Sequence, residues 1–91
     1  MITVYKFSAE WNESSKQYDS TFNKISKEYK DSEIEFKNVD VEESVELATK
    51  YSIKFVPITV IEVNDEVIFK RVGILSEELL RDELNKLMIS K

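Results

Sequence analysis

Few side chains in this 91-residue sequence could carry out covalent chemistry. Cysteine and histidine are both absent, so Ser15 could act as a nucleophile only with Lys6 or Lys16 as its base. A lysine accepts a proton near neutral pH only when its pKa is strongly lowered. We therefore expect Ser15 to have a structural role, and an enzyme that uses Ser15 or Lys6 is the least favoured function.

The same composition argues against metals, cofactors and nucleic acid. Zinc and iron–sulfur sites need Cys or His ligands. The acidic runs at residues 40–43, 77–78 and 82–83 lack the alternating oxygen ligands and central glycine of a calcium loop, so we expect solvated surface there. The net charge of −5 opposes binding to nucleic acid or to an anionic membrane. No cofactor is expected.

Length and composition predict one small domain over residues 1–91. A chain that is 42% apolar can form one compact core, and its single Gly and single Pro leave no room for a flexible linker. No apolar run approaches membrane-spanning length, and the start lacks the pattern of a secretory signal. We expect a cytoplasmic monomer.

Hydrophobic periodicity predicts the order β-α-β-α-β-β-α. Strands are expected at residues 2–7, 34–39, 57–63 and 66–71, and helices at about 13–30, from about 40 to 50 or 51, and from 76 onward. This alternation predicts an α/β fold, with a right-handed crossover and a sheet that carries helices on both faces.

Local signals support these elements. An apolar stripe at helical spacing identifies the first helix: Tyr18, Phe22, Ile25 and Tyr29. Asn12 or Ser14 could cap that helix, and Asp40 with Glu43 has the spacing of a capping box for the second. Asn64-Asp65 suits a tight hairpin turn. Ser76 is the expected cap of the last helix, whose Leu80, Leu84 and Leu87 should pack inward.

Four separate segments resemble the thioredoxin-like family. Residues 7–16 read F-S-A-E-W-N-E-S-S-K, similar to the active-site turn F-x-A-x-W-C-G-P-C-K. Residues 39–53 align without a gap with V-D-V-D-x-x-x-x-L-A-x-x-Y-x-I, and Glu42 stands at the second Asp. Residues 55–59 resemble S-V-P-T, whose proline is cis in the family, and residues 72–76 resemble V-G-A-x-S. The chain is identified as a short member lacking the leading strand and helix.

The resemblance implies a thioredoxin-like four-stranded mixed sheet and a changed active site. Asn12 and Ser15 stand where the family has its two cysteines, and Glu13-Ser14 replaces Gly-Pro. Lys6 occupies the position of the buried acid that serves as proton shuttle. Neither Asn12 nor Ser15 can supply a thiolate or form a disulfide, so thiol–disulfide exchange is excluded. Lys6 would either face a ligand or pair with a nearby carboxylate, and we favour pairing.

With thiol–disulfide exchange excluded, the resemblance implies a binding function. In the family, a shallow groove for extended polypeptide is lined by residues that correspond here to Trp11, Val56 with Pro57, and Gly73 with Ile74. We expect a redox-inactive protein–protein interaction module, with a phage or mobile element as one possible source. Equally open is that Trp11 is packed by its neighbours and Pro57 is kept for architecture. A cysteine-less variant of a thiol–disulfide oxidoreductase is the other alternative.

Overall fold

A computed structural model describes residues 1–89 of the chain, and the seven elements follow the predicted order. The strands are β1 (Ile2–Ser8), β2 (Ile34–Asp40), β3 (Ile58–Val63) and β4 (Glu66–Val72). The helices are α1 (Glu13–Glu28), α2 (Val45–Lys50) and α3 (Glu77–Ile89). Helix α1 ends two residues before the predicted end, because Tyr29 leaves helical geometry with φ −106° and ψ 14°.

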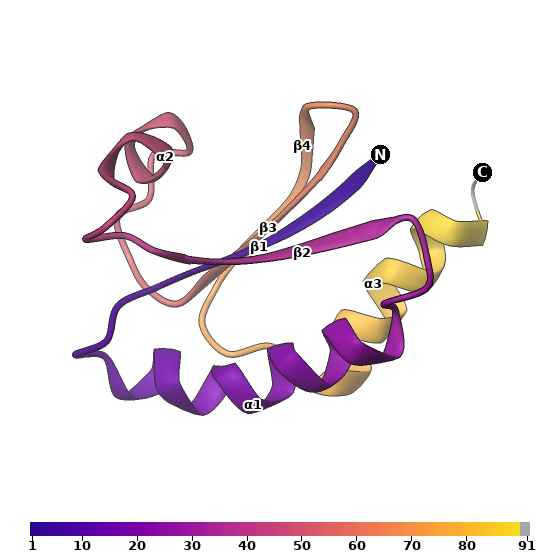
Figure 1. Cartoon of the computed structure of the whole chain (residues 1–91), viewed down its shortest axis with the longest axis horizontal. Coiled ribbons are helices and arrows are strands. Elements are labelled where there is room, and N and C mark those ends of the chain that lie inside the picture. Colours follow the sequence, from indigo (N-terminus) through magenta and orange to yellow (C-terminus); the bar gives the residue numbers. More distant parts are fainter. Residues whose placement is uncertain (90–91) are drawn as a thin grey trace.

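The four strands form one mixed sheet in the order β2-β1-β3-β4. Strand β1 is parallel to β2 and antiparallel to β3, and β3 and β4 form an antiparallel hairpin. Helices α1 and α3 lie together on one face of this sheet, and α2 lies on the other (Figure 1). The predicted thioredoxin-like α/β architecture is confirmed.

Each face of the sheet carries its own core, which explains why β1 is buried along most of its length. The core under α1 and α3 contains Ile2, Val4, Tyr18, Phe22, Ile25, Ile34, Ile61, Leu75, Leu80 and Leu84. The core under α2 contains Tyr5, Phe7, Val39, Tyr51, Ile58 and Val60. The predicted stripe of α1 and the leucines of α3 thus pack against the same face.

The predicted capping box at Asp40 and Glu43 is wrong. Strand β2 continues to Asp40, which pairs with Ser8 of β1, so Asp40 is extended rather than at a helix start. Its carboxylate accepts a hydrogen bond from the Glu42 backbone N–H at 2.8 Å, which forms a turn between strand and helix. Helix α2 begins only at Val45, and no side chain caps it.

Other local predictions are confirmed. Asn64 and Asp65 both have positive φ, 51° and 70°, as a two-residue hairpin turn requires. The Ser76 hydroxyl accepts a hydrogen bond from the Leu79 N–H at 3.1 Å and so caps α3. The Val56–Pro57 peptide bond is cis. No helix within residues 1–89 combines the length and apolar character needed to cross a membrane.

Candidate functional site

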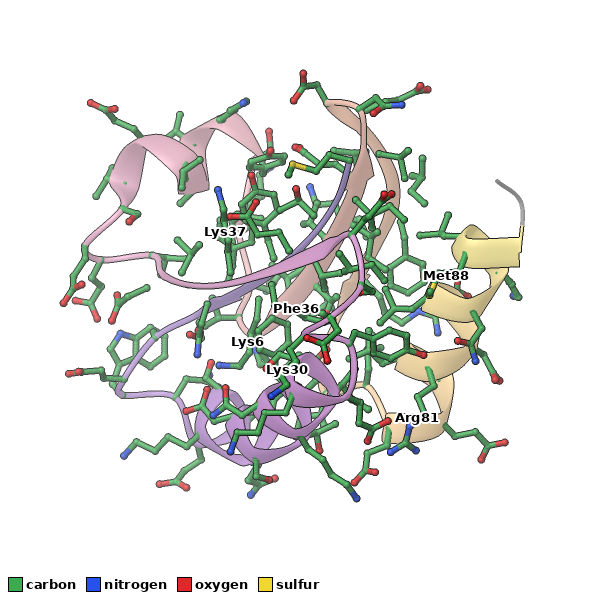
Figure 2. All side chains as sticks on the ribbon, turned by 45° about the vertical axis from the view of Figure 1, so that its right-hand side comes forward. Lys6, Lys30, Phe36, Lys37, Arg81 and Met88 are labelled. Atoms are coloured by element: carbon green, nitrogen blue, oxygen red, sulfur yellow. The ribbon has the colours of Figure 1, made fainter. Side chains whose placement is uncertain are left out.

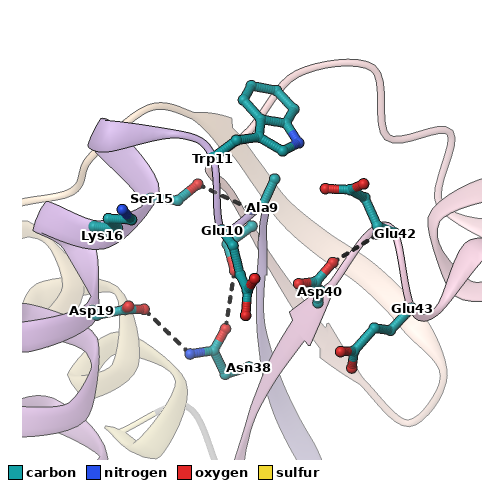
Figure 3. A pocket seen from close by; sticks show the side chains of 11 residues that line it. Ala9, Glu10, Trp11, Ser15, Lys16, Asp19, Asn38, Asp40, Glu42 and Glu43 are labelled. Carbon is teal, nitrogen blue, oxygen red and sulfur yellow. Dashed lines mark hydrogen bonds between the residues drawn. The ribbon is translucent and has the colours of Figure 1, made fainter.

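The turn between β1 and α1 holds the two residues at the former cysteine positions. Asn12 caps α1, and its side-chain oxygen accepts a hydrogen bond from the Ser15 backbone N–H at 2.7 Å. The Ser15 hydroxyl accepts one from the Ala9 N–H at 3.3 Å, and the Ser15 side chain is buried. Both side chains are therefore engaged in closing the turn, and Figure 3 shows the bond between Ser15 and Ala9.

Lys6 is fully buried in β1, where the strand passes over α1 (Figure 2). Its ammonium forms an ion pair with the Asp19 carboxylate and lies 3.4 Å from the side-chain oxygen of Asn38. It also lies 6.0 Å from the centre of the Tyr18 ring. Its charge is thus compensated inside the fold by α1 and β2, because a lysine buried without a partner would be very unfavourable.

Tyr18 extends the polar contacts beneath the turn toward β3. Its hydroxyl lies 2.7 Å from the Thr59 hydroxyl, and both residues are fully buried. Burial raises the pKa of the Tyr18 phenol to about 12, although the hydrogen bond to Thr59 acts in the opposite direction. Lys6, Tyr18 and Thr59 are therefore neighbouring polar side chains buried inside the fold.

Beside the turn, a hollow of about 290 Å³ separates Trp11 from the loop that precedes β3. Trp11 is 68% exposed and Phe55 is 65% exposed, so two large aromatic side chains beside this hollow present most of their surface to solvent. The hollow is lined by Trp11, Asn12, Val41, Ile53, Lys54, Phe55 and Val56. Trp11 is thus not packed away by its neighbours.

The loop before α3 approaches the same region from the other side. The Gly73 N–H donates a hydrogen bond to the Pro57 carbonyl at 2.8 Å, which ties the two loops together. Gly73 has a φ of +104°, a backbone conformation that residues with a side chain rarely adopt. Ile74 is 44% exposed. Gly73 and Ile74 do not line the 290 Å³ hollow, whereas Trp11 and Val56 do.

Val56, at the edge of this hollow, has backbone groups without a hydrogen-bond partner in the part of the chain that the structure describes. Within residues 1–89, no group forms a hydrogen bond with the N–H or C=O of Val56. Unpaired backbone groups seek partners in water or in another chain. The neighbouring Pro57 carbonyl already accepts a hydrogen bond from Gly73, whereas the N–H and C=O of Val56 are available to a partner.

Sequence reasoning missed three contributors to the site. Phe55 occupies the place of a small polar residue in the S-V-P-T pattern, and that departure was the available signal for an exposed aromatic. Asn38 is opposite Lys6 in the parallel pairing of β1 and β2, so strand alternation could have placed them together. Asp19 gave no such signal, because its contact with Lys6 depends on how α1 packs against β1 and not on strand pairing.

Comparison with known proteins identifies the family. The family model for Thioredoxin matches residues 1–86, so this chain belongs to the thioredoxin family. No match was found among curated protein sequences. The structure is similar to thioredoxin from Fasciola hepatica, with 27% identity, a TM-score of 0.84, and coverage of 93% of this chain and 79% of that one.

Two further solved structures share the fold. Thioredoxin from Trypanosoma brucei brucei is 23% identical with a TM-score of 0.84, and the match covers 97% of this chain and 75% of that one. A structure described as a malarial protein is 23% identical with a TM-score of 0.85, and the match covers 94% and 96% of the two chains. Family members are thiol–disulfide oxidoreductases, whereas this chain contains no cysteine.

Proposed function

We propose that this protein is a redox-inactive thioredoxin-family domain that binds another protein through the surface beside its altered active-site turn. One observation carries the proposal. Asn12 and Ser15 are engaged in the helix cap, while the adjacent Trp11 remains 68% exposed. An exposed tryptophan beside an apolar hollow is typical of a binding anchor.

The redox-inactive part of the proposal follows from the chemistry of the two positions. Thiol–disulfide exchange needs an attacking thiolate and a second thiol that resolves the mixed disulfide. An amide stands at position 12 and a buried hydroxyl at position 15. The Ser15 hydroxyl accepts a hydrogen bond from Ala9, and the Lys6 ammonium is paired with Asp19, which disfavours a serine–lysine enzyme as well.

The binding part rests on the hollow and the free backbone of Val56. An extended segment of a partner could place an apolar side chain between Trp11 and Phe55 while pairing its backbone with Val56, in the manner of strand addition. Pro57, Gly73 and Ile74 would support this segment from the adjoining loops. The partner protein, a monomeric state and a cytoplasmic location all belong to this proposal.

A phage or mobile-element source, with a host factor as the bound protein, is one form of this proposal. A cysteine-less laboratory variant of an active oxidoreductase fits less well, because Glu13, Ser14 and Lys6 also differ from the family pattern, and simple cysteine replacement would leave those positions unchanged.

A capture experiment with two matched variants tests the binding function. The native domain is immobilised beside Trp11→Ala and Met88→Ala, and bound proteins from the source organism are identified and then titrated in purified form. Met88 is a control because it is an exposed apolar residue on α3, away from the turn (Figure 2). A partner that loses about ten-fold or more in affinity with Trp11→Ala alone supports the proposal. A partner indifferent to Trp11→Ala would refute it.

A further inference from the structure

We infer that the bound segment of the partner carries basic residues at the end that lies over the β1–α1 turn and the end of β2. This inference rests on the proposed function and names the chemistry of the partner. The occupant is an extended polypeptide with an apolar residue for the hollow beside Trp11, followed by lysine or arginine residues. Charge complementarity across one continuous surface carries the argument.

Trp11 connects the apolar hollow to a second, larger one. This second hollow has a volume of about 850 Å³ and lies between the start of α1 and the end of β2 (Figure 3). It is lined by Ser8, Ala9, Glu10, Trp11, Ser15, Lys16, Asp19, Asn38, Asp40, Glu42 and Glu43. A chain that leaves the apolar hollow past Trp11 therefore enters a space whose lining carries five carboxylates and one lysine.

Four of the five carboxylates of this acidic hollow have no cationic partner within residues 1–89. The fifth, Asp19, is paired with the buried Lys6. In the part of the chain that the structure describes, Glu10, Glu42 and Glu43 form no ion pair, and the Asp40 carboxylate accepts only the Glu42 backbone N–H. Their negative potential is thus available to a partner.

The alternatives to a basic polypeptide are less well supported. Within residues 1–89, the acidic side chains do not form a group suited to hold a metal ion. Lys16 is the one cationic side chain among those lining the hollow, so an anionic partner would meet mostly like charge there. Trp11 adds a further preference, because the face of an indole attracts lysine and arginine.

The two hollows also give the partner a direction. Lys54 lines the apolar hollow and is not among the residues that line the acidic one. A basic run is therefore repelled beside Lys54 and attracted beside Glu42 and Glu43. The surface therefore favours one orientation of the bound segment, with its basic end over the acidic hollow.

The test uses three fluorescent peptides that share the extended core Thr-Val-Leu-Val, followed by a run of arginines, serines or glutamates. Binding is measured by fluorescence anisotropy at low and at high salt. Native protein is compared with Glu42→Gln/Glu43→Gln, and with Glu78→Gln/Asp82→Asn as the control. The control removes two charges from the exposed residues Glu78 and Asp82 of α3.

The arginine peptide should bind about ten-fold more tightly than the serine peptide, and high salt should weaken it. Glu42→Gln/Glu43→Gln should reduce this preference about five-fold, while the α3 control leaves it unchanged. If the three peptides bind the native protein equally and none binds the Trp11→Ala variant, the basic partner is refuted and the proposed function still stands. Absence of binding at about 1 mM, or a preference that survives Glu42→Gln/Glu43→Gln, would also refute this inference.

Discussion

The side-chain oxygen of Asn12 accepts a hydrogen bond from the backbone N–H of Ser15 at 2.7 Å. The two residues at the former cysteine positions are therefore bonded to each other. In a catalytic member of the family, these positions hold groups that must be free to change partners. Here the same spacing serves a helix cap, because a residue at the start of α1 and the amide three residues later are always close.

The cap predicts a loss of stability when the Asn12 side chain is removed. Asn12→Ala should lower the free energy of unfolding by about 1 kcal/mol, because the Ser15 amide loses its side-chain acceptor. Asn12→Asp should keep the native stability, because an aspartate oxygen also accepts this hydrogen bond. Urea denaturation followed by circular dichroism measures the change. Asn23→Ala, on the exposed surface of α1, is the control and should be neutral or stabilising. Equal effects of Asn12→Ala and Asn23→Ala would contradict the role of the cap.

Restoring the two cysteines should restore part of the redox chemistry. Asn12→Cys/Ser15→Cys places thiols at the start of α1, where the helix amides lower the pKa of the thiol at position 12 below its usual value of about 8.5. We expect an intramolecular disulfide that dithiothreitol reduces. Insulin reduction should remain slower than in a catalytic thioredoxin, because position 6 lacks the carboxylate that serves the family as proton shuttle.

Mass spectrometry of alkylated protein measures the disulfide of that double variant. Asn12→Cys and Ser15→Cys alone are the controls, since neither single variant can close the ring. A double variant that folds but forms no intramolecular disulfide would show that Glu13-Ser14 holds the turn in a geometry unsuited to the bond.

The buried ion pair predicts an asymmetry between its two ends. Asp19→Asn leaves the fully buried Lys6 ammonium without its carboxylate and should destabilise the protein by about 2 kcal/mol. This value is below that of a fully buried pair, because the Asp19 side chain is 46% exposed and water screens it. Lys6→Met should be close to neutral, because an apolar side chain of similar shape needs no partner.

The double variant Lys6→Met/Asp19→Asn separates the charge effect from a loss of packing. Its stability should be close to that of Lys6→Met, as expected when Asp19 matters mainly through Lys6. Urea denaturation provides all four free energies. If Asp19→Asn destabilises the Lys6→Met protein as much as the native one, the ion pair is not the source of the effect.

Alkaline pH should destabilise the protein through its buried tyrosines. Burial raises the pKa of Tyr18 from 10.0 to about 12, so the folded state holds the proton more tightly than the unfolded state. The resulting stability is complete below about pH 10 and is lost as the pH rises to about 12. For Tyr18 this amounts to about 2 to 3 kcal/mol.

Urea denaturation from about pH 8 to about pH 12 measures this loss. Tyr18→Phe should remove part of it. The rest should come from Tyr51, whose pKa is also raised, first by burial and then by its hydrogen bond to Glu62. Tyr51→Phe is therefore the companion variant. An unchanged alkaline loss in Tyr18→Phe would mean that Tyr18 ionises equally easily in both states.

The sequence by itself determined the order of the elements and the identity of the fold. The stripe from Tyr18 to Ile25, the turn at Asn64-Asp65 and the caps at Asn12 and Ser76 could be recognised because each depends on residues close together in the chain. The motif around Trp11 identified the family for the same reason. The capping box at Asp40 failed because pairing with Ser8, more than thirty residues earlier, kept that residue extended.

Only the tertiary structure decided what the altered site contains. The pairing of Lys6 with Asp19, the exposure of Trp11 beside Phe55, and the acidic hollow each join segments that are distant in sequence. The physical reason is that residue type and periodicity report which face a side chain takes within its own element. The partners it meets depend on how strands pair and how helices pack across the sheet.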